Sequence, residues 1–265
     1  MQHLETVETP QEVISVTDLW AAYDSEPVLE DINLSVRELD FIGLMGPNGG
    51  GKTTLVKVLL GLLRPTRGGV RIMGKSAKEG RRYIGYVPQW IEFDREFPIS
   101  VWDVARMGRL GKRGLLRRYT VEDDQAVTEA LRDVEMLHLQ TRPIGELSGG
   151  QRQRVYIARA LVTGARILLL DEPMASVDPP VSASLYELLR RLNDHVTILM
   201  ISHDMSAISS YVKTVGCINR RLFYHGDKQI TADMLEEAYQ CPIDLLAHGV
   251  PHRVLPEHGE GEVQP

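Results

Sequence analysis

The sequence predicts an α/β fold with a mostly parallel central sheet, an N-terminal antiparallel β-subdomain and an inserted helical subdomain. Three nearly continuous apolar runs are typical of strands buried on both faces of a parallel sheet. They lie at 41–45, 167–170 and 196–201. The runs at 13–19 and 28–36 mix apolar and polar residues instead, as strands with one wet face do. Residues 98–146 contain few β-branched runs and several helical patterns, which predict the insert.

The composition describes an ordinary globular chain. Its 265 residues suffice for one large or two small domains. Lys and Arg total 30 and Asp and Glu total 36, so the net charge of −6 indicates no nucleic-acid partner. Residues 1–11 lack the basic start and apolar core of a signal peptide, and no apolar run approaches the roughly 20 residues of a membrane span. We therefore expect a chain that is neither secreted nor membrane-spanning.

Tyr23 lies between the two N-terminal strands, which fit an antiparallel sheet. Its aromatic ring could stack on a purine, or it could pack against its own turn. Position alone favours packing, because aromatic residues are common on such sheets.

A Gly-rich segment follows the apolar run at 41–45 and fits the phosphate-loop pattern G-x-x-x-x-G-K-[ST]. Glycines let several backbone N–H groups approach a triphosphate closely, a lysine can reach its β- and γ-phosphates, and a threonine hydroxyl can ligate Mg²⁺. An ordinary Gly-rich turn is the alternative, but a helical pattern directly afterwards favours the nucleotide site. The loop consists of Gly46, Pro47, Asn48, Gly49, Gly50, Gly51, Lys52, Thr53 and Thr54, and the helical pattern of Leu55, Val58, Leu59 and Leu62.

Turns and short strands are predicted after this helix. Residues 65–80 are rich in Gly, Pro, Arg and Lys and favour turns around a short strand at 70–73. Another strand is expected at 83–87, where Pro88 and Gln89 end it.

Within the helical insert, Thr120 and Asp123 form a helix start signal. One helical face after it consists of Val127, Ala130, Leu131, Val134 and Leu137. The insert also carries a basic cluster, for which a solvated face is favoured over nucleic-acid binding because no aromatics interleave it. This cluster consists of Arg106, Arg109, Lys112, Arg113, Arg117 and Arg118.

A second helix start with exposed backbone N–H groups follows the insert. Ser148 and Gln151 form a capping box, and Gly149 and Gly150 lie between them at the positive end of the helix. This start could bind phosphate, or the residues could serve capping alone. The expected inner positions of the helix are Val155, Ala158, Leu161 and Val162.

Acidic residues follow the buried strand at 167–170. A carboxylate at such a strand end beside a phosphate loop can hold Mg²⁺, the role we predict for Asp171. Glu172 could polarise an attacking water as a general base, an effect typically worth about 10²- to 10⁴-fold. His203 follows the run at 196–201 and could sense the γ-phosphate, although a structural hydrogen bond is the more common use.

Taken in this order, the segments from about residue 12 to 228 resemble the ATP-binding subunit of ABC transporters. The phosphate loop matches 46–53, and the family's signature matches 147–151. Asp171 and Glu172 match its Mg²⁺ strand. The resemblance implies a P-loop NTPase fold with a helical subdomain inserted at about 90–150, followed by an extension over 229–265.

The resemblance also assigns roles to single residues. Gln89 corresponds to the glutamine loop, with a part in catalysis and in holding Mg²⁺, and His203 to the switch histidine. It implies that Tyr23 stacks adenine, which reverses the preference from position. Asp178 falls in the cross-dimer loop, where 175–177 depart from the usual Ser-Ala-Leu.

In such proteins two chains pair head to tail, so that the signature of one completes the ATP site of the other. The resemblance thus implies a homodimer, ATP and Mg²⁺ as cofactors, a separate membrane permease, an extracytoplasmic binding protein and a place on the inner face of the cell membrane. The sequences of residues 47–54, 97–104 and 247–255 are similar to those of bacterial zinc or manganese importers. Importers of iron chelates or cobalamin, non-transport ABC ATPases and small-molecule kinases are the alternatives.

The C-terminal extension is expected to contain a short helix at 231–240. After it, Cys241, His248, His252 and His258 could sense zinc, but no tight ligand spacing joins them, and a mobile, solvated end is favoured. Cys241 and the other cysteine, Cys217, form no Cys-x-x-Cys pair, which fits a reducing cytosol.

Overall fold

The structure is a computed structural model that describes residues 10–89, 97–113, 118–175, 177–202, 211–225, 245–246 and 252–253. In these residues a six-stranded sheet with the order β10-β9-β3-β8-β7-β6 forms the centre. β3, β6, β7, β8 and β9 run parallel, and β10 pairs antiparallel with β9. The strands are β3 (Phe41–Met45), β6 (Ile84–Val87), β7 (Ile167–Asp171), β8 (Thr197–Ile201), β9 (Thr214–Asn219) and β10 (Arg221–His225).

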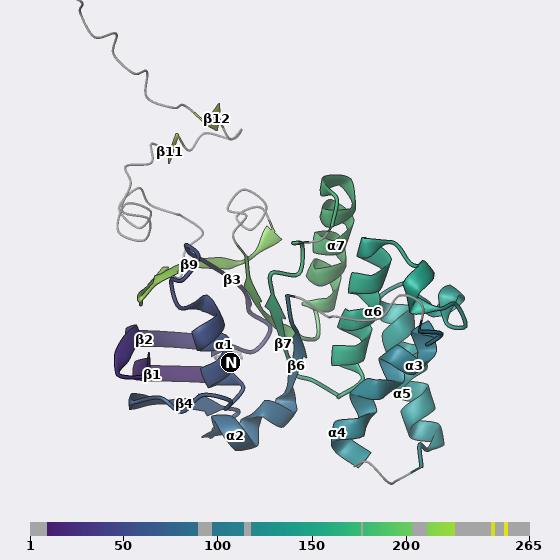
Figure 1. Ribbon diagram of the computed structural model, residues 1–265, viewed down its shortest axis with the longest axis horizontal. Coiled ribbons are helices and arrows are strands. Elements are labelled where there is room, and N and C mark those ends of the chain that lie inside the picture. The colour runs from purple at the N-terminus through teal and green to yellow at the C-terminus, as the bar shows by residue number, and fades with distance from the viewer. Residues whose placement is uncertain are drawn as a thin grey trace, which may run out of the picture.

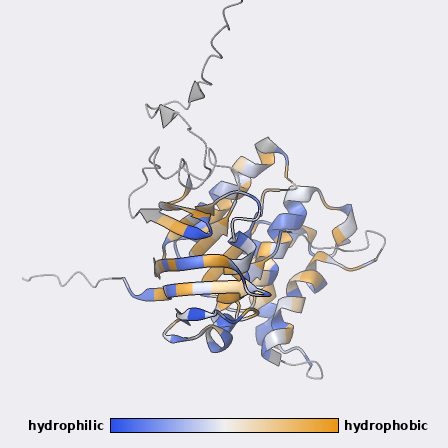
Figure 2. Ribbon diagram, turned by 60° about the vertical axis from the view of Figure 1, so that its left-hand side comes forward, coloured by the Kyte–Doolittle hydropathy of each residue, from blue (hydrophilic) through white to orange (hydrophobic). Residues whose placement is uncertain are grey.

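The three apolar runs form the middle of this sheet, as predicted. Every residue of β3, β7 and β8 is buried, which explains why these strands show no alternation of polar and apolar residues. Figure 2 shows the strands at the centre of the molecule mostly in the colour of hydrophobic residues. The predicted α/β class with a mostly parallel sheet is therefore confirmed.

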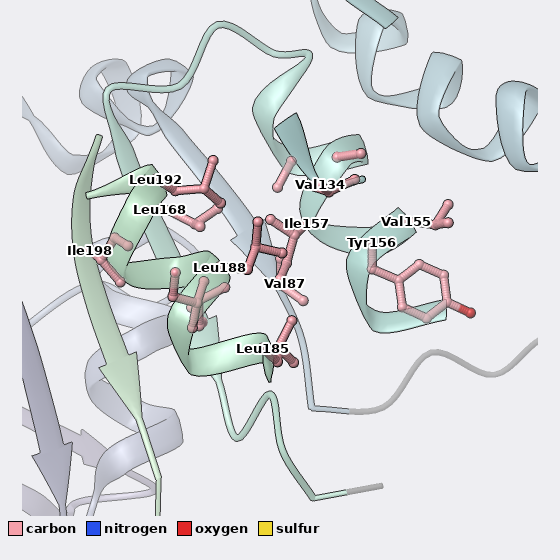
Figure 3. Packing of buried hydrophobic residues seen from close by; sticks show 14 of the residues in the cluster. Val87, Val134, Val155, Tyr156, Ile157, Leu168, Leu185, Leu188, Leu192 and Ile198 are labelled. Carbon is pink, nitrogen blue, oxygen red and sulfur yellow. The ribbon is translucent and has the colours of Figure 1, made fainter. Parts of the chain in front are cut away.

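Alternate residues of the central strands enter two separate hydrophobic clusters. On one face, Leu168 and Ile198 pack with side chains of α6 (Gly149–Leu161) and α7 (Pro179–Leu192), as Figure 3 shows. On the other face, Ile42 and Leu169 pack with α1 (Lys52–Leu59) and the N-terminal strands. The central sheet thus separates α1 from α6, which lie on opposite sides of it in Figure 1.

The N-terminal part forms a four-stranded antiparallel sheet with the order β2-β1-β4-β5. The strand predicted at 70–73 begins earlier than expected, because its backbone pairs with β1 from Arg67 onward. The short helix α2 (Ala77–Gly80) follows this sheet. The strands are β1 (Glu12–Tyr23), β2 (Glu26–Arg37), β4 (Arg67–Ile72) and β5 (Lys75–Ser76).

The helical insert is confirmed in its described residues, which contain α3 (Val101–Arg106), α4 (Leu110–Arg113) and α5 (Val121–Asp133). The 3-10 turns η2 (Met107–Arg109), η3 (Leu137–Leu139) and η4 (Ile144–Glu146) connect them and lead to α6, and η1 (Arg81–Tyr83) precedes β6. Thr120 and Asp123 form the predicted capping box at the start of α5.

Two predicted helical faces end earlier than expected. α5 ends at Asp133, and Glu135 has a φ of 62°, so Leu137 lies in η3 rather than on the same helix. Likewise α1 ends at Leu59, and Gly61 has a φ of 65°. Leu62 then lies beyond this turn and is 67% exposed, so it is not part of the buried face.

The prediction of a solvated face is wrong for part of the basic cluster. The Arg109 side chain is only 13% exposed and pairs at 2.6 Å with the fully buried carboxylate of Asp123. It also donates to the carbonyl oxygen of Val162, at the end of α6, at 2.8 Å. Arg106 pairs with Asp124 at 2.8 Å. These arginines join the helices of the insert.

The C-terminal extension is described only at β11 (Leu245–Leu246) and β12 (His252–Arg253), which pair antiparallel. The predicted helix at 231–240 lies outside the described residues, as do Cys241, His248 and His258. In the described part of the chain, no helix is long and apolar enough to cross a membrane.

Replacing Arg109 tests the buried pair. Arg109→Met should lower the free energy of unfolding by about 3 kcal/mol, because it leaves the Asp123 carboxylate buried without its guanidinium. Arg142→Met is the matched control, since Arg142 and Glu146 form a pair whose side chains are 47% and 56% exposed, and it should cost less than about 1 kcal/mol. Urea denaturation measures both, and equal losses would contradict a special role for the buried pair.

Candidate functional site

The phosphate loop connects β3 to α1 in a conformation that suits glycine. Gly49 and Gly51 have φ angles of 80° and 98°, which L side chains rarely adopt. At Gly46 a Cβ atom would lie 1.9 Å from the carbonyl oxygen of Ile218, so no side chain fits there. The loop is therefore packed directly against the backbone of β9, and its shape depends on these glycines.

Lys52, the first residue of α1, is buried within the loop. Its ammonium donates to the carbonyl oxygens of Gly46 at 2.7 Å and Pro47 at 3.0 Å. Burial lowers the pKa of Lys52, while the nearby carboxylates of Glu172 and Asp171 raise it in part. The cation is thus held between the loop and two acids.

A pocket of about 300 Å³ opens over the loop. It combines the loop with Gln89, which follows β6, and Glu172, which follows β7. The structure therefore brings three predicted parts of the site together. The lining residues are Val28, Pro47, Asn48, Gly49, Gly51, Lys52, Thr53, Thr54, Gln89 and Glu172.

Gln89 and Glu172 are in direct contact, since Nε2 of Gln89 donates to Oε2 of Glu172 at 2.8 Å. Glu172 has a φ of 45°, a left-handed conformation that costs a non-glycine residue on the order of 1 kcal/mol or more. Its N–H donates to the carbonyl of Ile201 at 2.8 Å, and its own carbonyl accepts from Ala175 at 3.1 Å. The backbone on both sides thus fixes this side chain at the pocket.

Asp171 ends β7 and is 5% exposed. Its pKa is raised by burial and further by the charge of Glu172. Tyr86 on β6 donates its hydroxyl to Oδ2 of Asp171 at 3.4 Å, and burial raises the pKa of Tyr86 to about 12. Tyr86 was not predicted from the sequence. Its position on the strand next to β7, three residues before Gln89, is the sequence signal that could have indicated it.

The residues around the pocket offer donors that suit Mg²⁺. Thr53 and Gln89 line the pocket and supply a hydroxyl and an amide oxygen. Asp171, directly before Glu172, supplies a buried carboxylate but is not among the lining residues. Oxygen-only donor sets of this kind are those that Mg²⁺ prefers. The residues present therefore fit that ion.

Tyr23 lies beside α1 and is 40% exposed. The ammonium of Lys57 lies 5.5 Å from the centre of its ring and 3.4 Å from its hydroxyl. Lys57 is one helical turn after Thr53, so the ring is next to the exposed side of α1. Tyr23 is not among the residues that line the pocket.

The second helix start lies elsewhere in the molecule. Ser148 and Gln151 form the predicted capping box at the start of α6. A Cβ atom on Gly150 would lie 2.2 Å from Cγ1 of Val181, and Asp178 is the exposed N-cap of α7. The first turns of α6 and α7 are therefore in contact. None of Ser148, Gly149, Gly150, Gln151 and Asp178 lines the pocket over the phosphate loop.

The region of the predicted switch histidine is only partly described. Ser202 is 3% exposed and donates its N–H to the carbonyl of Leu44, next to the phosphate loop. His203 lies outside the described residues, as does Ser176. The described residues therefore reach the edge of the sheet at Ser202, and the role of His203 stays a prediction.

Known proteins match this chain in sequence and in structure. The family described as ABC transporter matches residues 29–175. The zinc uptake system ATP-binding protein ZurA of Listeria innocua is 40% identical over 219 residues, which cover 81% of this chain and 85% of that protein. The manganese transport system ATP-binding protein MntB of Bacillus subtilis is 40% identical over 240 residues, covering 89% and 95%.

A solved chain from an ABC transporter assigned to the metal-chelate type, in an inward-facing conformation, has a TM-score of 0.78 and 26% identity. The match covers 91% of this chain and 97% of that one. Together with the phosphate loop and the two acids at the end of β7, these matches show that the chain belongs to the ABC transporter family, as one of its ATP-binding subunits.

Proposed function

We propose that this chain hydrolyses ATP to power the import of a divalent metal ion, zinc or manganese, through a separate membrane permease. The observation that carries the proposal is the contact between Gln89 and Glu172 in the pocket over the phosphate loop. This contact supports a role for the Glu172 carboxylate as a base beside the γ-phosphate of a bound nucleotide. The cargo rests on the relatives named for zinc uptake and manganese transport.

The phosphates of ATP are bound by the loop and the start of α1. Backbone N–H groups of 46–54 and the positive end of α1 attract the triphosphate. Lys52 is already confined there by Gly46 and Pro47, and a short side-chain movement brings its ammonium to the β- and γ-phosphates. Tyr23, beside α1, supplies a face on which adenine can stack.

Asp171, Thr53 and Gln89 would hold Mg²⁺, which when bound would neutralise negative charge on the phosphates. Glu172 is held by its backbone and by the amide of Gln89, so its carboxylate can accept the proton of an attacking water. His203, which follows β8 in the sequence, is proposed to contact the γ-phosphate. Because Gln89 lines the pocket and directly precedes the helical insert in the chain, it connects the nucleotide site to that insert.

A second copy of the chain completes the site. The helix starts of α1 and α6 are both suited to phosphate, but the helices pack on opposite faces of the central sheet. Head-to-tail pairing brings Ser148, Gly149, Gly150 and Gln151 of one copy to the ATP held by the phosphate loop of the other. Asp178 lies next to this surface, because α7 begins against α6. ATP would then hold the homodimer together.

The proposed assembly includes an integral membrane permease and an extracytoplasmic substrate-binding protein. The catalytic domain spans 12–228, and its helical subdomain at about 90–150 receives the permease. Residues 229–265 form an extension outside this domain. The chain acts at the cytoplasmic face of the membrane and needs no nucleic acid.

Import of an iron chelate or a cobalamin-like ligand is the second candidate. The structural match to a transporter of the metal-chelate type favours it. That match has 26% identity, whereas the relatives named for zinc and manganese reach 40%. We therefore place the metal ions first.

Two variants test the ATPase chemistry. Glu172→Gln should keep ATP affinity and lower single-turnover hydrolysis by at least about 10²-fold, because an amide cannot accept the proton. Lys52→Ala should weaken ATP binding instead. Glu187→Gln, an exposed carboxylate on α7 paired with Arg190, is the matched control and should leave both unchanged. Brisk hydrolysis by Glu172→Gln would remove Glu172 as the base.

The oligomeric state tests the composite site. Glu172→Gln should change from monomer to dimer when Mg·ATP is added, because uncleaved ATP stays between the two helix starts. Light scattering after size exclusion measures this change. The double variant Glu172→Gln with Lys52→Ala should remain monomeric. A monomeric Glu172→Gln protein at saturating ATP would contradict pairing through ATP.

Transport assays test the cargo. The chain reconstituted in proteoliposomes with its co-purified permease and binding protein should take up radioactive zinc or manganese only with ATP. The same assembly with Glu172→Gln should show uptake at least about 10²-fold slower, because transport then lacks hydrolysis. Uptake of an iron chelate with neither metal ion transported would favour the second candidate.

A further inference from the structure

The end of β9 and the turn after it lie directly against the phosphate loop. Cβ atoms on Gly46 and Gly50 would lie 1.9 and 2.9 Å from the carbonyl oxygen of Ile218, so the loop and the end of β9 are in backbone contact. Between these strands, Arg220 donates its N–H to the carbonyl oxygen of Gly50 at 3.0 Å. Arg220, which is far from the phosphate loop in the sequence, thus holds the peptide group between Gly50 and Gly51.

The turn is fixed on its other side by β2. Arg220 has a φ of 57°, and its carbonyl oxygen accepts from the N–H of Glu30 at 2.8 Å. The carboxylate of Glu30 lies 3.9 Å from the guanidinium of Arg220 and 3.7 Å from that of Arg221. Both polar groups of the Arg220 backbone are therefore used, one on the loop and one on a strand of the other sheet.

The bond to Gly50 determines where the next N–H points. A trans peptide is planar and carries its C=O and N–H on opposite sides. Because the carbonyl of Gly50 points toward Arg220, the N–H of Gly51 points the other way. Gly51 lines the pocket, and its φ of 98° completes the turn into α1.

We propose that the backbone N–H of Arg220 is a positioning group for ATP binding, which aims the N–H of Gly51 at the phosphates by holding the carbonyl of Gly50. The inference rests on the proposed role of 46–54 as the phosphate loop. The bond to Gly50 differs from the side-chain bonds that Lys52 makes within the loop. Lys52 holds Gly46 and Pro47 by a flexible side chain that must also serve the phosphates, whereas the bond from Arg220 comes from a backbone anchored in two sheets.

A backbone substitution isolates this group. Arg220→Ala keeps the N–H, and lactic acid at the same position, introduced by cell-free translation, replaces the amide by an ester that has no donor. The ester form should bind ATP and tripolyphosphate about 10-fold more weakly than Arg220→Ala, since a misaimed N–H costs roughly one hydrogen bond to a charged group. Calorimetric titration measures both ligands.

The matched control is the same pair at Glu135. This residue has a similar φ of 62° and donates its N–H to Arg132 at 2.9 Å, but it lies in the helical insert. The proteins with alanine and with lactic acid at position 135 should bind ATP equally well, and tripolyphosphate equally well. If Arg220 had only a structural role, the ester form at position 220 would unfold at a lower temperature than the alanine form, but tripolyphosphate would shift the Gly51 amide resonance equally in both. The proposal predicts a smaller shift of this resonance in the ester form.

Arg220→Gly provides a second test that does not depend on the ester. Glycine keeps the N–H and suits a positive φ, so ATP affinity should stay within about twofold of the unchanged chain. A tenfold loss in Arg220→Gly would assign the effect to the side chain and overturn the proposal, as would equal binding by the ester and alanine forms. If Lys52→Ala binds tripolyphosphate as well as the unchanged chain, the phosphate-loop role itself fails.

Discussion

The parallel register of β3, β8, β7 and β6 is the constraint on which the site depends. Parallel strands end at the same edge of a sheet, and Asp171 pairs with Ile201 there as Val87 pairs with Leu170. The phosphate loop after β3, Glu172 after β7 and Gln89 after β6 therefore line one pocket. The apolar runs that form these strands thus also determine which polar residues line this pocket.

The same sheet keeps the starts of α1 and α6 apart. Its residues alternate between a cluster with α1 and a cluster with α6 and α7, so the two helices lie in different layers. The contact between Gly150 and Val181 makes the first turns of α6 and α7 one surface. In the proposed dimer the start of α6 therefore binds the ATP of another molecule, because it cannot reach the phosphate loop of its own chain across the sheet.

The sequence predicted the features that depend on local patterns. Buried strands, both capping boxes and the glycine-rich loop follow from residue type and spacing, and the structure has them. Features decided by tertiary contacts were missed or mistaken. Leu62 continues the helical pattern of the sequence, but it lies beyond the end of α1 and is exposed. Arg109 was predicted to lie on a solvated face, but its side chain is mostly buried because it pairs with the buried carboxylate of Asp123. Tyr86 and Arg220 carry no motif, because their partners are distant in the chain.

In the proposed dimer, ATP lies between the phosphate loop of one copy and the start of α6 of another. A crystal structure of Glu172→Gln with Mg·ATP would show this arrangement. The γ-phosphate should lie within about 3 Å of backbone N–H groups at Gly149 or Gly150 of the second copy, with Lys52 of the first copy on the same nucleotide. ATP bound at the loop with the α6 starts of all copies facing solvent would contradict this arrangement.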